Sequence, residues 1–86
     1  MQQYAVSFRR SADKDLRRLD ATVQRRVLRA INGLARNPRP EGCRKLVGSD
    51  NAFRVRVGNY RVIYTVEDAI FVVAIESIRH RREAYR

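Results

Sequence analysis

Hydrophobic and polar residues alternate near the start of the chain, where Tyr4, Val6 and Phe8 are separated by small residues. A period of two is typical of a strand with one buried face. Beyond residue 10 the apolar positions recur every three to four residues, which is typical of helices packed along one side. We therefore expect a short N-terminal strand followed by helices.

Two helices are predicted before residue 37. Ser11 is a candidate N-cap for the first helix, and Asp20 is a candidate N-cap for a second helix that runs to about Arg36. The first apolar stripe consists of Ala12, Leu16 and Leu19, and the second of Val23, Val27, Ala30, Ile31 and Leu34. Because almost no linker separates the helices, we expect an antiparallel helical hairpin.

The second half of the chain is predicted to be β-rich, since Pro38, Pro40 and Gly42 end the helical pattern. The expected strands cover residues 44–47 at an edge, 53–57, 60–66 and 70–78. The last of these is apolar at nearly every position, which indicates a central strand. The predicted fold is a single α+β domain over residues 1–86, in which the N-terminal strand and helical hairpin precede a three- to four-stranded antiparallel sheet.

Gly58 and Asn59 predict a two-residue hairpin turn, and such a turn determines the register of the strands on either side. The expected opposing pairs are Val57 with Tyr60, Arg56 with Arg61, Val55 with Val62, and Arg54 with Ile63. In this register Arg54, Arg56 and Arg61 share the face opposite the apolar side chains.

Like charges on one face of a strand pair repel one another, so the three arginines are expected to bind an anion. The alternative is a solvated face on which the arginines splay apart. In that case Glu76, whose position in the alternation puts it on the same face, would neutralise them.

The overall charge favours a nucleic-acid partner. The 86 residues contain 19 Lys and Arg against 9 Asp and Glu, for a net charge of +10, and Lys14 and Lys45 are the only lysines. Arginine has a planar fork that matches phosphate geometry and stacks on bases. An acidic protein partner would account for the same excess, and both partners are compatible with it.

Several other classes of protein are disfavoured by the sequence. No signal peptide or membrane-spanning segment is evident, and the lone Cys43 cannot form an internal disulfide, so we expect a cytoplasmic protein. One histidine and one cysteine are too few for a zinc site, and no phosphate-binding glycine loop is present. We expect no metal or other cofactor.

The C-terminal segment is rich in cations and contains His80, the only histidine of the chain, and Tyr85. Because it follows the central strand directly, its first residues should emerge beside the arginine-bearing face. Tyr85 either caps the core or presents its ring to a base. A nuclease without metal would suit RNA, whose own 2′-hydroxyl can attack the adjacent phosphate, and His80 and Tyr85 are then the candidate proton-transfer groups.

Two stretches resemble the RelE family of toxins, within the RelE/ParE superfamily. They are residues 53–64, FRVRVGNYRVIY, and residues 78–85, IRHRREAY. The resemblance covers essentially the whole chain and implies a RelE-like fold with a very short C-terminal helix. It implies a toxin of a type II toxin–antitoxin system that cleaves mRNA in the ribosomal A site without metal, and a RelB-like antitoxin bound to it as a hetero-oligomer.

The resemblance also implies roles for individual residues. Arg61 would hold the scissile phosphate, Arg81 matches a second family arginine, and Tyr85 matches a tyrosine that stacks on a base. The remaining expected catalytic residues are Arg54, Arg56 and His80, and the expected RNA contacts are Arg54, Arg56, Arg79, Arg82 and Lys45.

The sequence departs from the family pattern in two ways. Arginine at Arg54 and Arg56 cannot transfer protons near neutral pH, so that role would pass to His80, Tyr85 or ribosomal RNA. Arg79 stands where a glycine is usual. Two alternatives remain open, which are a ParE-like gyrase inhibitor and a non-catalytic RNA- or DNA-binding module.

Overall fold

The computed structural model describes residues 3–82, in which a five-stranded sheet carries two helices. The elements are β1 (Ala5–Phe8), α1 (Arg10–Arg17), α2 (Ala21–Leu34), β2 (Arg44–Lys45), β3 (Ala52–Val57), β4 (Tyr60–Glu67), the short 3-10 helix η1 (Asp68–Ile70) and β5 (Val72–His80). This order confirms the α+β class. The expected C-terminal helix and Tyr85 lie outside the described residues.

The strand order in the sheet is β1-β5-β4-β3-β2. Strands β2 to β5 pair antiparallel, whereas β1 pairs parallel with β5. The N-terminal strand therefore joins the sheet as a parallel edge, so the sheet has five strands and is mixed. β5 lies between β1 and β4, as expected of the most apolar strand, although it begins at Val72. Ile70 and Phe71 precede it and are exposed.

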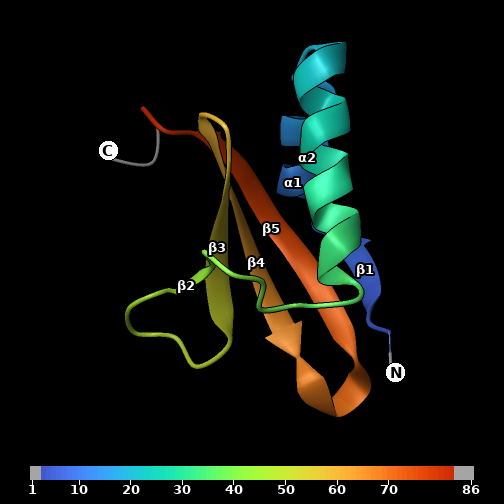
Figure 1. Cartoon of the computed structure of the whole chain (residues 1–86), viewed down its shortest axis with the longest axis vertical. Coiled ribbons are helices and arrows are strands. Elements are labelled where there is room, and N and C mark those ends of the chain that lie inside the picture. Colours follow the sequence, from blue (N-terminus) through green and yellow to red (C-terminus); the bar gives the residue numbers. More distant parts are fainter. Residues whose placement is uncertain (1–2, 83–86) are drawn as a thin grey trace.

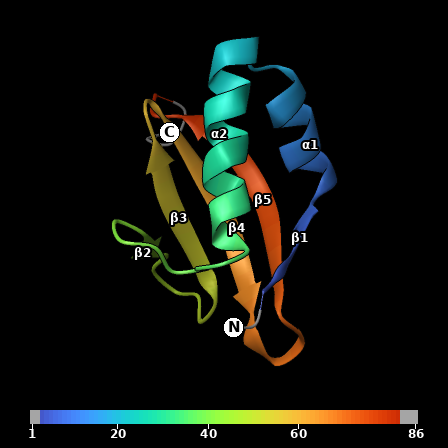
Figure 2. The ribbon, with the colours of Figure 1, turned by 45° about the vertical axis from the view of Figure 1, so that its right-hand side comes forward.

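Both helices cover one face of the sheet, and within residues 3–82 the opposite face carries no helix (Figures 1 and 2). The Asp20 side chain caps α2 by accepting a hydrogen bond from the Val23 N–H at 3.0 Å, as predicted. The prediction for Ser11 is wrong, because α1 begins at Arg10. The Ser11 hydroxyl instead donates to the Glu76 carbonyl of β5 at 2.7 Å, so it fastens the helix to the sheet.

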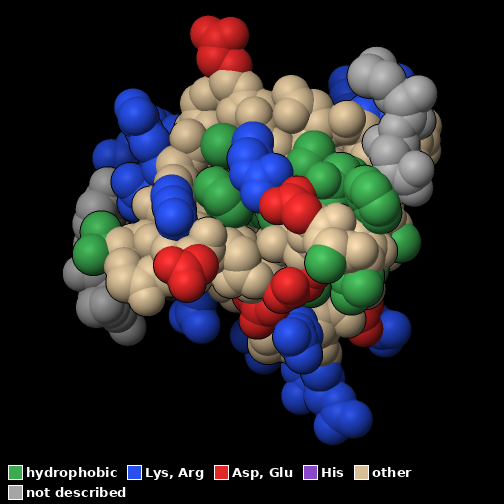
Figure 3. Space-filling view, turned by 90° about the horizontal axis from the view of Figure 1, so that it is seen from below, with side chains coloured by type: hydrophobic (Ala, Val, Ile, Leu, Met, Phe, Trp, Pro, Cys, Tyr) green, Lys and Arg blue, Asp and Glu red, His purple; other side chains and the backbone are tan. Residues whose placement is uncertain are grey.

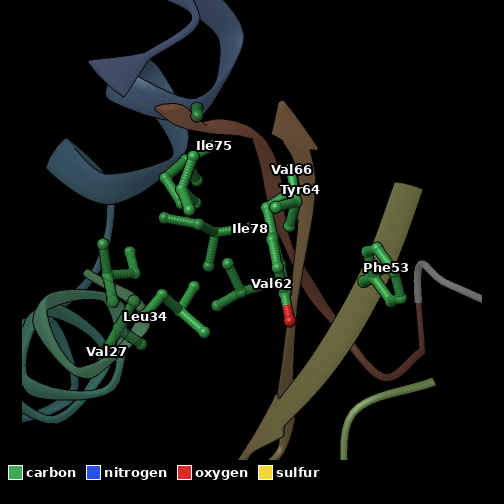
Figure 4. Close-up of a cluster of buried hydrophobic side chains, with 11 residues drawn as sticks. Val27, Leu34, Phe53, Val62, Tyr64, Val66, Ile75 and Ile78 are labelled. Atoms are coloured by element: carbon green, nitrogen blue, oxygen red, sulfur yellow. The ribbon is translucent and has the colours of Figure 1, made fainter. Parts of the chain in front are cut away.

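The hydrophobic core fills the space between the helices and the sheet (Figure 4). Val27, Ile31 and Leu34 of α2 are at most 1% exposed, which confirms the predicted stripe. They face Val62, Tyr64, Val66, Ile75 and Ile78 of the two central strands. The alternation of β3 and β4 places their apolar side chains in this core, so their arginines must point to the other side of the sheet.

The end of the molecule at the β4–β5 turn carries a mixture of hydrophobic, acidic and basic side chains (Figure 3). Here Arg39 binds Asp68 at 2.7 Å and Tyr4 donates to the same carboxylate at 2.6 Å. The Arg39 hydrogen bond, followed by that of Tyr4, lowers the pKa of Asp68. This network ties the segment after α2 to η1 and to the chain start. No helix within residues 3–82 has the length and apolar character needed to cross a membrane.

Candidate nucleic-acid interface

The β3–β4 hairpin turn sets the geometry of the candidate site. Gly58 has a φ of 59°, in the left-handed region that favours glycine, and it is followed by Asn59. A Cβ at this position would lie 3.4 Å from the Arg26 guanidinium, which shows that this α2 side chain lies against the turn. The turn closes the hairpin with Val57 opposite Tyr60, as predicted.

A row of three arginines crosses the sheet next to this turn. Arg56 of β3 lies opposite Arg61 of β4, and Arg61 lies opposite Arg79 of β5. Directly opposed residues in antiparallel strands point to the same face. The structure thereby confirms the predicted register and extends the row to a third strand.

Two further arginines on this face lie farther from the turn than the row does. Arg54 is two residues before Arg56 on the same strand, and it pairs with Arg44 of β2. A hollow of about 230 Å³ is lined by Gly42, Arg44, Arg54, Arg56 and Arg61. We call the five residues Arg44, Arg54, Arg56, Arg61 and Arg79 the arginine face.

Glu76 does not neutralise this face as the alternative interpretation required. The pairing of β4 with β5 shifts at Ile63 and Tyr64, whose partners are Ser77 and Ile75, so Glu76 is the extra residue of a β-bulge. The bulge breaks the alternation on which the expectation for Glu76 depended. Its carboxylate pairs with Arg9 at 3.1 Å, next to the start of α1.

Lys45, an expected RNA contact, lies on the other side of the sheet. It pairs with Phe53, whose side chain belongs to the core, whereas its neighbour Arg44 pairs with Arg54. The sequence interpretation missed Arg44. The sequence offered no pattern that would distinguish Arg44 from its neighbour Lys45. A strand of two residues is too short for periodicity to show which residue points to which face.

His80 also lies away from the arginine face. Its ring contacts Tyr60 edge-to-face, with the ring centres 5.1 Å apart, and Tyr60 packs against the core on the helix side. The Nδ1 atom of His80 accepts a hydrogen bond from the Arg82 N–H at 3.2 Å. The geometry thus separates His80 from Arg54, Arg56 and Arg61.

Arg81 and Arg82 extend the cationic surface at the hairpin tip. The Arg81 N–H donates to the Asn59 carbonyl at 2.7 Å, so the segment after β5 is bonded to the β3–β4 turn. Arg81 and Arg82 line a hollow together with Asn59 and His80. Both therefore lie at the same end of the sheet as the Arg56–Arg61–Arg79 row.

The arginine face is suited to binding phosphate and to offsetting negative charge. Guanidinium groups donate several hydrogen bonds in a fixed plane and remain charged at any physiological pH. They cannot act as general acids or bases under these conditions. Within residues 3–82, no three His, Cys, Asp or Glu side chains gather in a way that could hold a metal ion.

Comparison with known proteins places the chain in a family. The family model described as the ParE toxin of the type II toxin–antitoxin system parDE matches residues 6–85. The chain belongs to the RelE/ParE superfamily of type II toxins. Among curated relatives, this toxin is 33% identical to toxin RelG of Mycobacterium tuberculosis over 87 residues, covering 96% of this chain and 97% of RelG. It is 31% identical to the putative toxin RelE1 of Methanocaldococcus jannaschii, covering 98% of this chain and 97% of that protein.

Solved toxins share the fold. RelE in the archaeal RelE–RelB complex of Pyrococcus horikoshii superposes on this toxin with a TM-score of 0.83 and 30% identity, covering 93% of this chain and 97% of that one. The isolated E. coli RelE toxin gives a TM-score of 0.80 with 27% identity, covering 95% of both chains. The RelE-like fold expected from the sequence is confirmed.

Proposed function

We propose that this toxin is a metal-independent endoribonuclease that cleaves mRNA on the ribosome and so inhibits translation. The observation that carries the proposal is the row of Arg56, Arg61 and Arg79 in direct opposition on three strands. Three arginines in direct opposition concentrate positive charge on one face of the sheet, and a phosphodiester is an anion whose geometry matches the guanidinium group.

The proposed reaction forms a bond between the ribose 2′-oxygen and the adjacent phosphorus while the bond from phosphorus to the 5′-oxygen breaks. A proton leaves the 2′-hydroxyl and another is delivered to the departing 5′-oxygen, which yields a 2′,3′-cyclic phosphate and a 5′-hydroxyl. Arg61, flanked by Arg56 and Arg79, would hold the phosphate and offset the charge that develops on it. Arg54 and Arg82 would bind the RNA backbone to either side.

The proton-transfer groups lie elsewhere in this proposal. His80 is on the helix side of the sheet with its Nδ1 already accepting a hydrogen bond, so we assign it no proton transfer. Tyr85 and ribosomal RNA are the remaining candidates. Tyr85 would also stack on a base next to the cleaved bond, and Arg81 would add a second contact to the phosphate.

A RelB-like antitoxin is the proposed partner in the cytoplasm, where the two form a hetero-oligomer. Toxins of this fold have been solved as RelE–RelB complexes from P. horikoshii and as the toxin–antitoxin complex RelBE2 from M. tuberculosis. The net charge of +10 favours a partner with an acidic segment. Co-purification of the toxin with the product of an adjacent reading frame would test this assignment.

Gyrase inhibition is the second candidate, because the matching family model is described as a ParE toxin. The arginine face offers no particular advantage to a gyrase inhibitor, whereas it suits phosphate chemistry on RNA. A supercoiling assay with purified gyrase separates the two, since a ribonuclease should leave supercoiling unchanged. A module that only binds nucleic acid would bind tightly and in a salt-dependent way without cutting any strand.

Inducible expression followed by primer extension tests the main proposal. Wild-type toxin should arrest growth and produce mRNA ends within codons covered by ribosomes. Arg61→Ala and Arg81→Ala should abolish these ends while remaining folded. Arg25→Ala, which removes the same charge from an exposed position on α2, should retain them. Full cleavage by both active-site variants would refute the assignment.

A further inference from the structure

A third hollow lies at the same end of the molecule, on the helix side of the sheet. It has a volume of about 230 Å³ and is lined by Asp15, Arg18, Leu19, Tyr60, Ile78 and His80. We call it the tip hollow. Neither the phosphate chemistry of the arginine face nor the core requires it.

The tip hollow combines two aromatic rings with charged groups, and its lining is more polar than apolar. The rings of Tyr60 and His80 meet edge-to-face at an interplanar angle of 89°, and Leu19 and Ile78 add apolar surface. Arg18 is exposed at the end of α1. The Asp15 carboxylate is engaged within the protein, because its Oδ2 accepts the Ile78 N–H at 2.9 Å.

A second cation lies beside the hollow on the α2 side. Arg26 lies against Gly58 and, together with Tyr60, lines a small neighbouring depression. Tyr60 is thus flanked by Arg18, which directly follows α1, and by Arg26 of α2. Aromatic side chains that are bordered by arginines bind single-stranded nucleic acid by stacking on its bases while the cations contact its phosphates.

The tip hollow and the arginine face are neighbours across the end of the sheet. Arg79 and His80 are consecutive on β5, as are Tyr60 and Arg61 on β4, and consecutive strand residues point to opposite faces. An RNA strand that leaves the Arg56–Arg61–Arg79 row can therefore turn over the tip and reach Tyr60. The volume is below the range of about 300–1,000 Å³ of pockets for drug-sized ligands, so the hollow suits one base, with the sugar and phosphate of that nucleotide outside it.

We propose that the tip hollow binds one nucleotide of the same single-stranded RNA, with its base against Tyr60 and His80 and its phosphate between Arg18 and Arg26. This inference rests on the proposed function, since it assumes that RNA occupies the arginine face. It adds a subsite on the opposite face of the sheet from the cleaved bond, so it influences the length of RNA that the toxin prefers.

The unique histidine makes the proposal measurable, because the ring protons of His80 give a single NMR signal of each kind. The full-length protein is titrated with 2′-O-methyl oligonucleotides, which lack the attacking hydroxyl and cannot be cleaved. We expect the His80 ring signals to shift with a hexanucleotide. We also expect affinity to rise about tenfold at the length that first reaches the hollow, as base stacking on an aromatic ring predicts.

A matched pair of double variants separates the subsite from general electrostatics. Arg18→Gln with Arg26→Gln should remove the affinity step and the His80 shift. Arg25→Gln with Arg29→Gln removes the same charge from exposed α2 positions and should preserve both. Circular dichroism establishes that each variant is folded, and the wild-type titration needs no variant at all.

Two outcomes would overturn the proposal. One is a His80 signal that stays unmoved while the hexanucleotide saturates the arginine face. The other is a His80 signal that moves with an antitoxin but with no RNA, which would assign the hollow to a protein side chain. If no oligonucleotide binds and no mRNA is cut in cells, the proposed function itself fails, which is a distinguishable result.

Discussion

Arg56 and Arg61 face each other directly across the β3–β4 hairpin. They form the second pair from the Gly58–Asn59 turn, next to the pair of Val57 and Tyr60. Arg79 continues the row on β5. Opposed like charges destabilise a strand pair. Under the proposed function, this loss of stability accompanies the affinity of the row for a phosphate. This opposition leads to a measurable conflict between folding and binding.

Replacing one member of the row should stabilise the fold and weaken RNA binding. We expect Arg56→Gln to raise the free energy of unfolding by about 0.2–1 kcal/mol at low salt, the usual size of a cross-strand charge effect. The gain should shrink in high salt because ions screen the repulsion. Urea titration at two salt concentrations measures both effects, with Arg25→Gln as a control. A loss of stability in Arg56→Gln would contradict the prediction.

Arg44 and Lys45 are adjacent cations that the sheet separates onto opposite faces. We expect Arg44→Gln to weaken RNA binding and to reduce the salt dependence of the binding constant by about one phosphate contact, a slope change of about 0.7 for single strands. Lys45→Gln removes the same charge and should leave the slope unchanged. Fluorescence anisotropy with an uncleavable oligonucleotide measures both. Equal effects would mean that only net charge matters.

Gly58 should be sensitive to substitution in a way that Gly48 is not. Both have positive φ values, 59° and 83°, so an alanine at either position is strained by about 1–2 kcal/mol. An added Cβ at Gly58 would also come into van der Waals contact with the Arg26 guanidinium at 3.4 Å, whereas nothing lies within 4 Å at Gly48. We expect both alanine variants to lose stability in urea titration. Only Gly58→Ala should also lose RNA affinity, and unchanged binding in that variant would count against the turn as the element that aligns the arginines.

The hydrogen bonds of Arg39 and Tyr4 to the Asp68 carboxylate should stabilise the fold at neutral pH. Arg39 and Tyr4 lower the pKa of Asp68 in the folded protein, so its contribution is present above the unfolded value of about 3.9 and is lost as the pH falls. The Asp68 hydrogen bond raises the pKa of Tyr4, whose contribution is present below about 10 and is lost at higher pH. Asp68→Asn should therefore be less stable than wild type at pH 7. The difference should begin to shrink as the pH falls to about 4, and it should vanish only below the lowered pKa of Asp68 in the folded protein. A difference that is independent of pH would exclude this origin.

The sequence alone determined the helical stripes and the hairpin that carries the site. Leu34 and Val27 share a face because the helical period is 3.6, and a two-residue turn at Gly58 leaves one register for Arg56 and Arg61. These relationships are local, since they depend on residues a few positions apart. Periodicity and turn chemistry were therefore enough to place three of the five arginines.

Tertiary structure decided what depends on contacts between distant segments. The parallel pairing of β1 with β5, the bulge that turns Glu76 toward Arg9, and the register that selects Arg44 over Lys45 all bring together residues far apart in the chain. A strand of two residues has no periodicity to read, and a bulge reverses every later assignment of faces. Such features are set by how whole elements pack together, and no local pattern in the sequence encodes them.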